Sequence, residues 1–279
     1  MSMQTDNSNF CETEKGVIVF HNKDEIPCIT IPHLHSQYEI YYNISGAKGL
    51  MIGGEVYGCG RYNLALIPRV QTHKVIVKKN EPYERCIINI DSRTVTLTET
   101  LCNHSCTEWI HNDALMVDLS PDEHNVFMSL IDGYNAAEKA EDKLLLFSKF
   151  LEIMSFLGNM FKKPPVKKPL EEKMISYTDL ILRCIEHNFQ KIKVGEIAED
   201  LHLNEDHMNR VFKEETGITI KHYLTLRKIA EAKKHLYTGK SVKEACRMSG
   251  FGNYANFLRT FKKYEGYSPG KLKELTQPL

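Results

Sequence analysis

The segment RVFKEETGIT at residues 210–219 returns farther along the chain as RTFKKYEGYS at residues 259–268. The two copies share, in register, an arginine, a phenylalanine, a lysine, a glycine and a final hydroxyl residue. A segment that recurs in register indicates a duplicated supersecondary unit. In each copy the glycine, Gly217 or Gly266, follows a helical pattern and is suited to end that helix in the left-handed conformation. We therefore predict two similar helical units in this part of the chain.

Each copy lies in the second helix of a predicted helix-turn-helix unit. The first unit has its helix, turn and helix at residues 194–201, 202–204 and 205–216, and the second has them at residues 242–248, 250–252 and 253–265. In such units the second helix enters the DNA major groove. A long helix over residues 220–236 connects the two units. If it spaces them by about 34 Å, they enter successive grooves on one face of the duplex.

The exposed faces of the two second helices are predicted to contact DNA. Arginine binds guanine and asparagine binds adenine, each through two hydrogen bonds. The second helix of the first unit contains both residue types. The predicted contact residues are Glu205, Asp206, Asn209, Arg210 and Lys213 in the first unit, and Tyr254, Ala255, Leu258 and Arg259 in the second. The second set is poorer in side chains that read bases. We expect the first unit to supply more base specificity and the second more phosphate and methyl contact.

The distribution of charge supports a nucleic-acid partner. The 36 Lys and Arg residues balance the 36 Asp and Glu residues, so the net charge of the chain is zero. Residues 1–161 contain 13 basic and 21 acidic side chains, a net of −8, whereas residues 162–279 contain 23 and 15, a net of +8. A basic half favours binding to a polyanion. The simpler alternative is a helical domain with a solvated basic face, and two units in register argue against it.

Residues 174–275 resemble the DNA-binding domain of the AraC/XylS family of bacterial transcription regulators. The matching stretches are RKIAEA at residues 227–232, Gly250-Phe251, NFLRTFKK at residues 256–263 and GYSP at residues 266–269. The resemblance implies that all the contact residues named above except Lys213 face the bases. It also implies a front domain that binds a small-molecule effector, and activation rather than repression. Ala245-Cys246 departs from the family pattern, which has an aliphatic residue followed by alanine.

Residues 15–118 read as β structure. Short apolar or alternating runs separated by turn residues are typical of a small barrel or sandwich, and they occur at residues 17–20, 38–44, 50–52, 64–67 and 75–77. Gly53-Gly54 is suited to a two-residue hairpin turn. The fold class predicted for the whole chain is α+β with two domains. An N-terminal cupin-like β-barrel with two following helices precedes a C-terminal all-α domain with tandem helix-turn-helix units.

His33, His35, Glu39 and Gly46 fit the first motif of cupin barrels, and Pro68 followed by His73 resembles the second. If residues 33–43 form one strand, the odd-numbered side chains share a face that points into the barrel. The metal ligands predicted on this basis are His33, His35, Glu39 and His73, for a divalent Zn, Fe, Mn, Ni or Cu ion. The alternative is an organic effector bound without metal. The residues predicted to contact it are His33, His35, Glu39, Tyr41, Arg61 and His73.

Two helices are predicted after the barrel. Ser120, Pro121 and Glu123 form a helix start with an N-cap, a first-turn proline and a capping glutamate. A second helix, over residues 141–162, carries apolar side chains in two neighbouring rows, which fits either a homodimer interface or packing within the monomer. The predicted domains are a barrel at residues 1–118, a dimerisation segment at 119–162, a linker at 163–170 and a DNA-binding domain at 171–279. The linker is rich in proline and lysine.

The leading hypothesis is a transcription regulator that binds double-stranded DNA and is controlled by a small-molecule effector in the N-terminal barrel, with RNA polymerase as a further partner. A metal-dependent cupin enzyme or a metal-sensing regulator is the alternative, although the tandem units argue against an enzyme. A third hypothesis is redox sensing through Cys102 and Cys106, beside His104. The first ten residues lack a signal-peptide pattern and no apolar run approaches a membrane span, so the cytoplasm is expected. The eight cysteines are then expected to be free thiols.

Overall fold

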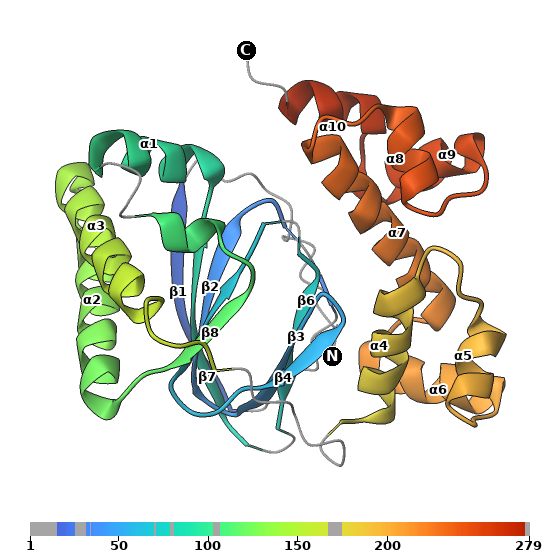
Figure 1. The fold of residues 1–279 in the computed structure, drawn as a ribbon, viewed down its shortest axis with the longest axis horizontal. Coiled ribbons are helices and arrows are strands. Elements are labelled where there is room, and N and C mark those ends of the chain that lie inside the picture. Colours follow the sequence, from blue (N-terminus) through green and yellow to red (C-terminus); the bar gives the residue numbers. More distant parts are fainter. Residues whose placement is uncertain are drawn as a thin grey trace. The chain divides into compact units, whose positions relative to one another are not determined.

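The computed structural model describes residues 16–25, 32–33, 35–69, 71–78, 81–102, 107–166 and 175–276. The chain divides into two compact units, residues 1–52 with 56–171 and residues 53–55 with 172–279 (Figure 1). Part of the predicted linker, residues 167–170, lies outside the described residues, and so do His104 and Cys106. Within the described ranges, no helix has the length and apolar character needed to cross a membrane.

The first unit contains two antiparallel sheets. The five-stranded sheet has the order β1-β7-β2-β5-β8, and the three-stranded sheet has the order β4-β3-β6. The strands are β1 (Val17–Asp24), β2 (Tyr38–Ser45), β3 (Ala47–Ile52), β4 (Glu55–Gly58), β5 (Asn63–Ile67), β6 (His73–Val77), β7 (Tyr83–Ile90) and β8 (Leu115–Asp118). Gly53 and Gly54 have φ angles of 60° and 93°, the positive values that a two-residue hairpin turn requires.

Strand β2 separates two apolar clusters. Ile40, Tyr42 and Ile44 belong to a cluster with residues of helices α2 and α3, whereas Tyr41 belongs to a second cluster. The second cluster contains Leu50 and Ile52 of β3, Ala65 and Ile67 of β5, and Tyr83 of β7. Since side chains alternate along a strand, one face of β2 lies toward the helices and the other toward the space between the sheets.

Two expectations for this unit were wrong in detail. The chain bends at Ser36 and Gln37 and β2 begins at Tyr38, so residues 33–43 are not one continuous strand. The predicted β region also contains helix α1 (Ser92–Cys102) and the 3-10 helix η2 (Glu108–His111). The sequence of α1 contains four threonines and one valine, residue types that favour strand. Its helical start is instead stabilised by Asp91, whose Oδ1 accepts a 2.7 Å hydrogen bond from the Thr94 amide.

Helices α2 (Pro121–Lys139) and α3 (Lys143–Met160) pack side by side against the larger sheet (Figure 1). The predicted start of α2 is confirmed, because Ser120 and Glu123 form a reciprocal capping box with proline at the first position. In α3, Phe150, Ile153, Met154 and Leu157 are buried in the monomer. Both rows of apolar side chains therefore contribute mainly to the core of this unit.

Between residues 175 and 276, the described part of the second unit contains helices and the turns that join them. Its helices are α4 (Tyr177–Asn188), α5 (Val194–Asp200), α6 (Glu205–Thr216), α7 (Ile220–Tyr237), α8 (Val242–Met248), α9 (Tyr254–Glu265) and α10 (Pro269–Thr276). The predicted helix pairs correspond to α5–α6 and α8–α9, and the predicted connecting helix is α7. Gly217 and Gly266 end α6 and α9 in the left-handed conformation, with φ angles of 77° and 79°.

Candidate functional site

Helix α6 is a surface helix with one buried face. Asn204 caps its start, because Asn204 Oδ1 accepts hydrogen bonds from the amides of Asp206 and His207 at 3.0 and 3.1 Å. Met208 and Phe212 are fully buried. These two anchors turn the opposite face of α6 to solvent, and that face carries the contact residues predicted from the sequence.

The exposed face of α6 has hydrogen-bonding groups that are held only loosely. Arg210 is 60% exposed and pairs with Glu214 Oε1 at 3.1 Å and with His207 Nδ1 at 3.0 Å. Asn209 is half-buried, and its Nδ2 donates to the backbone oxygen of Glu205 at 3.1 Å. Surface ion pairs of this kind are worth about 1 kcal/mol or less, so the Arg210 guanidinium can exchange Glu214 for another acceptor.

Helix α9 repeats the arrangement. Asn253 caps it by accepting a 2.8 Å hydrogen bond from the Asn256 amide, and Phe257 and Phe261 are fully buried. Tyr254, Ala255 and Arg259 are exposed as expected. Leu258, which was expected at the exposed front, is half-buried against the core of the second helical pair. Three exposed residues on α9 were not among the predicted contacts, namely Asn256, Lys262 and Lys263.

Helix α7 joins the two helix pairs. With 18 residues it is about 27 Å long at 1.5 Å per residue. Near its start, Tyr223 packs against Phe212 of α6, with ring centroids 5.9 Å apart. Near its end, the buried Lys233 donates to Glu265 Oε2 of α9 at 2.5 Å. Helix α7 therefore has direct contacts with both surface helices.

Further hydrogen bonds join the second pair to the middle of α7 and to the segment that follows α4. Lys228 Nζ donates to the backbone oxygen of Gly250 at 3.0 Å, and Gln190 Nε2 donates to the backbone oxygen of Met248 at 2.7 Å. Gly250 and Met248 belong to the second pair, whereas Gln190 immediately follows α4. The turn of the second pair is thus held against both α7 and the end of α4.

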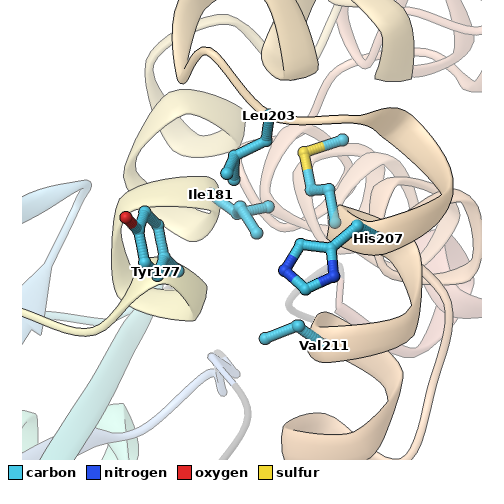
Figure 2. A pocket seen from close by; sticks show the side chains of 6 residues that line it. Tyr177, Ile181, Leu203, His207 and Val211 are labelled. Carbon is cyan, nitrogen blue, oxygen red and sulfur yellow. The ribbon is translucent and has the colours of Figure 1, made fainter.

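A small hollow lies between α4 and α6 (Figure 2). Its lining is apolar apart from the ring of His207 and the hydroxyl of Tyr177, and consists of Tyr177, Ile181, Leu203, His207, Met208 and Val211. None of the residues predicted for DNA or effector contact lines it. The hollow is part of the packing that supports α6.

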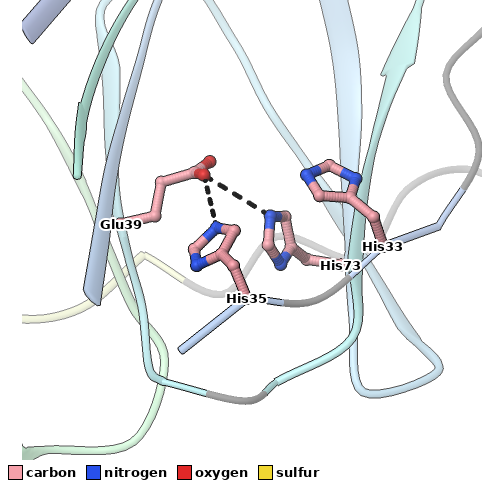
Figure 3. Close-up of side chains that lie close together, drawn as sticks. All are labelled: His33, His35, Glu39 and His73. Atoms are coloured by element: carbon pink, nitrogen blue, oxygen red, sulfur yellow. Dashed lines mark hydrogen bonds and ion pairs between the residues drawn. The ribbon is translucent and has the colours of Figure 1, made fainter. Parts of the chain in front are cut away.

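A second candidate site lies in the first unit, where the side chains of three histidines and one glutamate lie close together (Figure 3). One potential ligand atom from each of His33, His35, Glu39 and His73 lies within 4.8 Å of the others. Glu39 is on β2, and His73 begins β6. His33 forms an isolated β-bridge to His73, with backbone hydrogen bonds of 3.0 and 2.9 Å. Despite the bend in the chain, the structure thus brings together the four residues named from the cupin motifs.

Backbone carbonyls orient two of the imidazole rings. His35 Nδ1 lies 3.0 Å from the oxygen of Gln37, and His73 Nδ1 lies 2.9 Å from the oxygen of Gln71. A carbonyl only accepts, so both Nδ1 atoms carry hydrogen and both Nε2 atoms turn toward Glu39. His35 Nε2 lies 2.8 Å from Glu39 Oε2, but His73 Nε2 lies 3.6 Å from it and has no hydrogen-bond partner although buried.

The pKa values in this cluster are shifted by burial and mutual attraction. Burial opposes ionisation of Glu39, but His73 and His35 hold the pKa of its carboxyl well below the usual range. Burial also opposes protonation of His73, yet Glu39 raises the pKa of the imidazole. The carboxylate of Glu39 is therefore negatively charged and favours a positive charge, such as a protonated imidazole or a cation, beside it.

The other two predicted effector contacts lie outside the cluster. Tyr41 is fully buried between the sheets, where its hydroxyl accepts a 3.1 Å hydrogen bond from the hydroxyl of Tyr83. Arg61 is exposed, and its guanidinium lies over the ring of Tyr62, 4.7 Å from the centroid. The prediction from sequence thus combined residues from three different environments.

Sequence reasoning missed a polar contact on the helical side of β2. His124 of α2 lies 2.8 Å, through its Nδ1, from the hydroxyl of Tyr42, and its ring stacks on Tyr62 with centroids 4.0 Å apart. Burial, followed by the charge of Arg61, lowers the pKa of His124. The partners are 82 residues apart, so no local pattern reveals the contact.

Known proteins match both units. Residues 197–274 match the family model of a helix-turn-helix domain, and residues 29–116 match that of an AraC-like ligand-binding domain. The probable transcription factor PqrA of Proteus vulgaris is 34% identical over 98 residues, which cover 34% of this chain and 80% of that protein. The melibiose operon regulatory protein of Escherichia coli (strain K12) is 22% identical over 254 residues, 88% of this chain and 84% of that protein.

A longer relative matches over a larger part of the chain than PqrA does. The uncharacterized HTH-type transcriptional regulator YtdP of Bacillus subtilis (strain 168) is 30% identical over 162 residues, which cover 54% of this chain. The chain spans only 21% of the length of that regulator.

Proposed function

Because this chain belongs to the AraC family of transcription regulators, with an AraC-like ligand-binding domain followed by a helix-turn-helix domain, we propose that it controls transcription by binding DNA through α6 and α9. The observation that carries the proposal is the pair of capped helices with buried aromatic anchors and exposed polar faces. Each helix of the pair is suited to a major groove. The common support of α7 suits them to one continuous operator.

The contacts proposed for DNA are divided by chemistry. Arg210 and Asn209 of α6 have the side chains that discriminate bases. Glu205 and Asp206 flank them and favour bases that donate hydrogen bonds, such as cytosine. On α9, Tyr254, Ala255 and Leu258 supply apolar contacts, while Arg259 reaches a base or a phosphate. Lys213 of α6 and the unpredicted Lys262 of α9 are suited to phosphate oxygens, which positions the protein without reading sequence.

Control by a ligand is the second part of the proposal. A ligand shifts a regulator between states only by binding one state better than the other. The site proposed for it is the first unit, at His33, His35, Glu39 and His73, with Tyr41 and Arg61 retained as the more distant contacts. Activation through RNA polymerase, in the cytoplasm where bacterial DNA lies, completes the proposed role. No turnover of the ligand is proposed.

We further propose that α2 and α3 provide a homodimer contact. Although most of their apolar side chains are buried in the monomer, Val126 of α2 and Leu144 of α3 are 52% and 81% exposed. A second copy would cover them through an isologous contact. Analytical ultracentrifugation of the full chain tests this proposal. The wild type is expected to sediment as a dimer and Leu144→Asp mainly as a monomer. A wild type that sediments as a monomer contradicts the proposal.

The test of DNA binding starts from a random-sequence duplex library. The full chain is expected to enrich one sequence motif, and its affinity for the enriched duplex should fall steeply as the salt concentration rises. Arg210→Ala together with Arg259→Ala should abolish the enrichment. Arg93→Ala, which removes an exposed arginine of α1, is the matched control and should leave it intact. Enrichment by the double variant equal to that of the wild type would contradict the proposal.

A further inference from the structure

The four-residue cluster offers a complete set of metal donors. Three imidazoles and one carboxylate supply three nitrogen ligands and one oxygen ligand, which suits borderline divalent ions such as Zn²⁺. Glu39 and His73 are buried, and His33 and His35 are half-buried. The four donors therefore lie close together in a mostly buried part of the first unit.

The orientation of the histidine rings matches that of metal ligands. A histidine that binds a metal through one nitrogen usually donates the other ring N–H to a backbone carbonyl or carboxylate, which fixes the tautomer. His35 and His73 both do this, through Gln37 and Gln71, at 3.0 and 2.9 Å. Each ring therefore presents the lone pair of its Nε2 toward the same carboxylate when neutral.

Hydrogen bonds within the cluster leave one buried ring nitrogen without a partner. His73 Nε2 is buried without a hydrogen-bond partner, and its 3.6 Å distance from Glu39 Oε2 is too long for an N–H···O bond. That separation instead matches the distance between two ligands of one ion, and the 2.8 Å contact of His35 Nε2 with Glu39 Oε2 would lengthen when both atoms bind the ion. Ligand atoms about 2.0–2.2 Å from a tetrahedral zinc lie about 3.3–3.6 Å from each other. A metal ion would give the orphaned nitrogen its missing partner.

We propose that His33, His35, Glu39 and His73 bind one divalent transition-metal ion, such as Zn²⁺, and that this ion is the ligand to which the regulator responds. The second clause rests on the proposed function, whereas binding of the ion does not. Glu39 lies on β2 of the five-stranded sheet and His73 on β6 of the three-stranded sheet. The ion thus cross-links the two sheets, so it resists their separation and stabilises the folded protein.

The experiment measures metal binding directly on the full chain. The purified protein is stripped with a chelator, dialysed and titrated with Zn²⁺ against a chromophoric competitor. Elemental analysis of the reloaded protein gives the stoichiometry. We expect about one equivalent per chain, a rise in Tm on adding Zn²⁺, and a visible absorption band when Co²⁺ replaces it. Loss of an outer partner of a ligand typically weakens binding 10–100-fold, so loss of a ligand should cost about 100-fold or more.

Variants separate this site from other zinc-binding groups. Glu39→Gln keeps the shape of the side chain but removes the charge, and His33→Ala removes a half-buried ligand, so one of the two should fold even if the other does not. His21→Ala is the matched control, since His21 lies on β1 and pairs with Glu84 at 2.9 Å. It should bind Zn²⁺ as the wild type does. Absence of binding by the wild type, or undiminished binding by both cluster variants, overturns the proposal.

DNA affinity measured with and without Zn²⁺ tests the regulatory clause separately. We expect the affinity of the wild type for the enriched duplex to change with Zn²⁺ and that of Glu39→Gln to stay constant. Stoichiometric binding of Zn²⁺ with no change in DNA affinity would overturn the regulatory clause and leave a structural ion. Failure of the metal-free and metal-bound protein to bind any DNA would contradict the proposed function without touching the metal site.

Discussion

Arg227 Nε donates a 2.7 Å hydrogen bond to Glu186 Oε2 and so joins α7 to α4. The two side chains are 10% and 1% exposed. Tyr223 donates to the other carboxylate oxygen of Glu186 at 2.8 Å, and Arg227 Nη1 donates to Glu231 at 3.0 Å. The carboxylate of Glu186 is thus satisfied from two sides, and α4 is fixed to the connecting helix α7 by charge-assisted hydrogen bonds.

Glu186→Gln is expected to destabilise the second unit by about 3 kcal/mol, because it leaves the Arg227 guanidinium buried with only part of its compensation. Glu214→Gln is the matched control. It breaks the exposed pair with Arg210 at 3.1 Å and should cost less than about 1 kcal/mol. Urea unfolding followed by circular dichroism measures both. Equal costs would show that burial does not govern these two pairs.

Arg210→Ala and Lys262→Ala are expected to weaken DNA binding in different ways. Loss of a base contact at Arg210 should cost about 1–3 kcal/mol on the preferred duplex and relax the preference at one position. Loss of a phosphate contact at Lys262 should weaken all sequences alike and lower the salt slope by about 1. Fluorescence anisotropy on preferred and scrambled duplexes distinguishes them. A uniform loss for Arg210→Ala would move it to the phosphate contacts.

Tyr41→Phe should destabilise the first unit more than Tyr42→Phe. The first change leaves the buried hydroxyl of Tyr83 without its acceptor at 3.1 Å, at a cost of about 1–3 kcal/mol. The second removes a 2.8 Å contact to His124, which is half-buried and can turn to water, at a cost of about 1 kcal/mol. Denaturant midpoints of the two variants provide the comparison. The reverse order would mean that His124 is the more dependent partner.

Glu123→Gln tests a charge at the start of α2. The hydrogen bond from Lys163 and that from the Ser120 backbone lower the pKa of Glu123 below its ordinary value of 4.5. A carboxyl whose pKa is lower in the folded state contributes stability above its unfolded pKa, and that contribution disappears as the pH falls through the folded value. Glutamine keeps the cap without the charge. The difference between wild type and variant should be constant from pH 7 to 5 and shrink at lower pH.

Unfolding midpoints measured across this pH range check the prediction for Glu123. A difference that grows as the solution is acidified has the wrong sign for a lowered pKa. It would show that Lys163 does not pair with Glu123 in solution.

The sequence predicted best those features that are set by neighbouring residues. Asn204, Ser120 and Gly217 act within one helical turn, and the helix ends that they define were placed closely. Helix α1 was missed because its threonines and valine favour strand, while the capping contact from Asp91 and burial of Val95 and Thr98 favour helix. Local propensity is a weak guide where packing opposes it.

In the candidate sites, too, sequence spacing predicted some positions, and tertiary packing determines others. The faces of α6 and α9 follow from helical periodicity, yet the position of Leu258 depends on packing against a core that only tertiary structure defines. The spacing of His33, His35 and Glu39 suggested a common site with His73, and the structure places all four within 4.8 Å. Arg61 had no such spacing to support it, and it lies over Tyr62 instead.

Consecutive side chains of β2 lie in two different environments. Tyr41, between the sheets, and Tyr42, against α2, are consecutive residues, so one peptide unit separates the interior of the sandwich from its helical covering. Glu39 therefore lies on the face of β2 toward the space between the sheets, and the contact of Tyr42 with His124 lies on the opposite face. Because Glu39 and Tyr42 share this backbone, a shift of β2 would move the carboxylate and the His124 contact together.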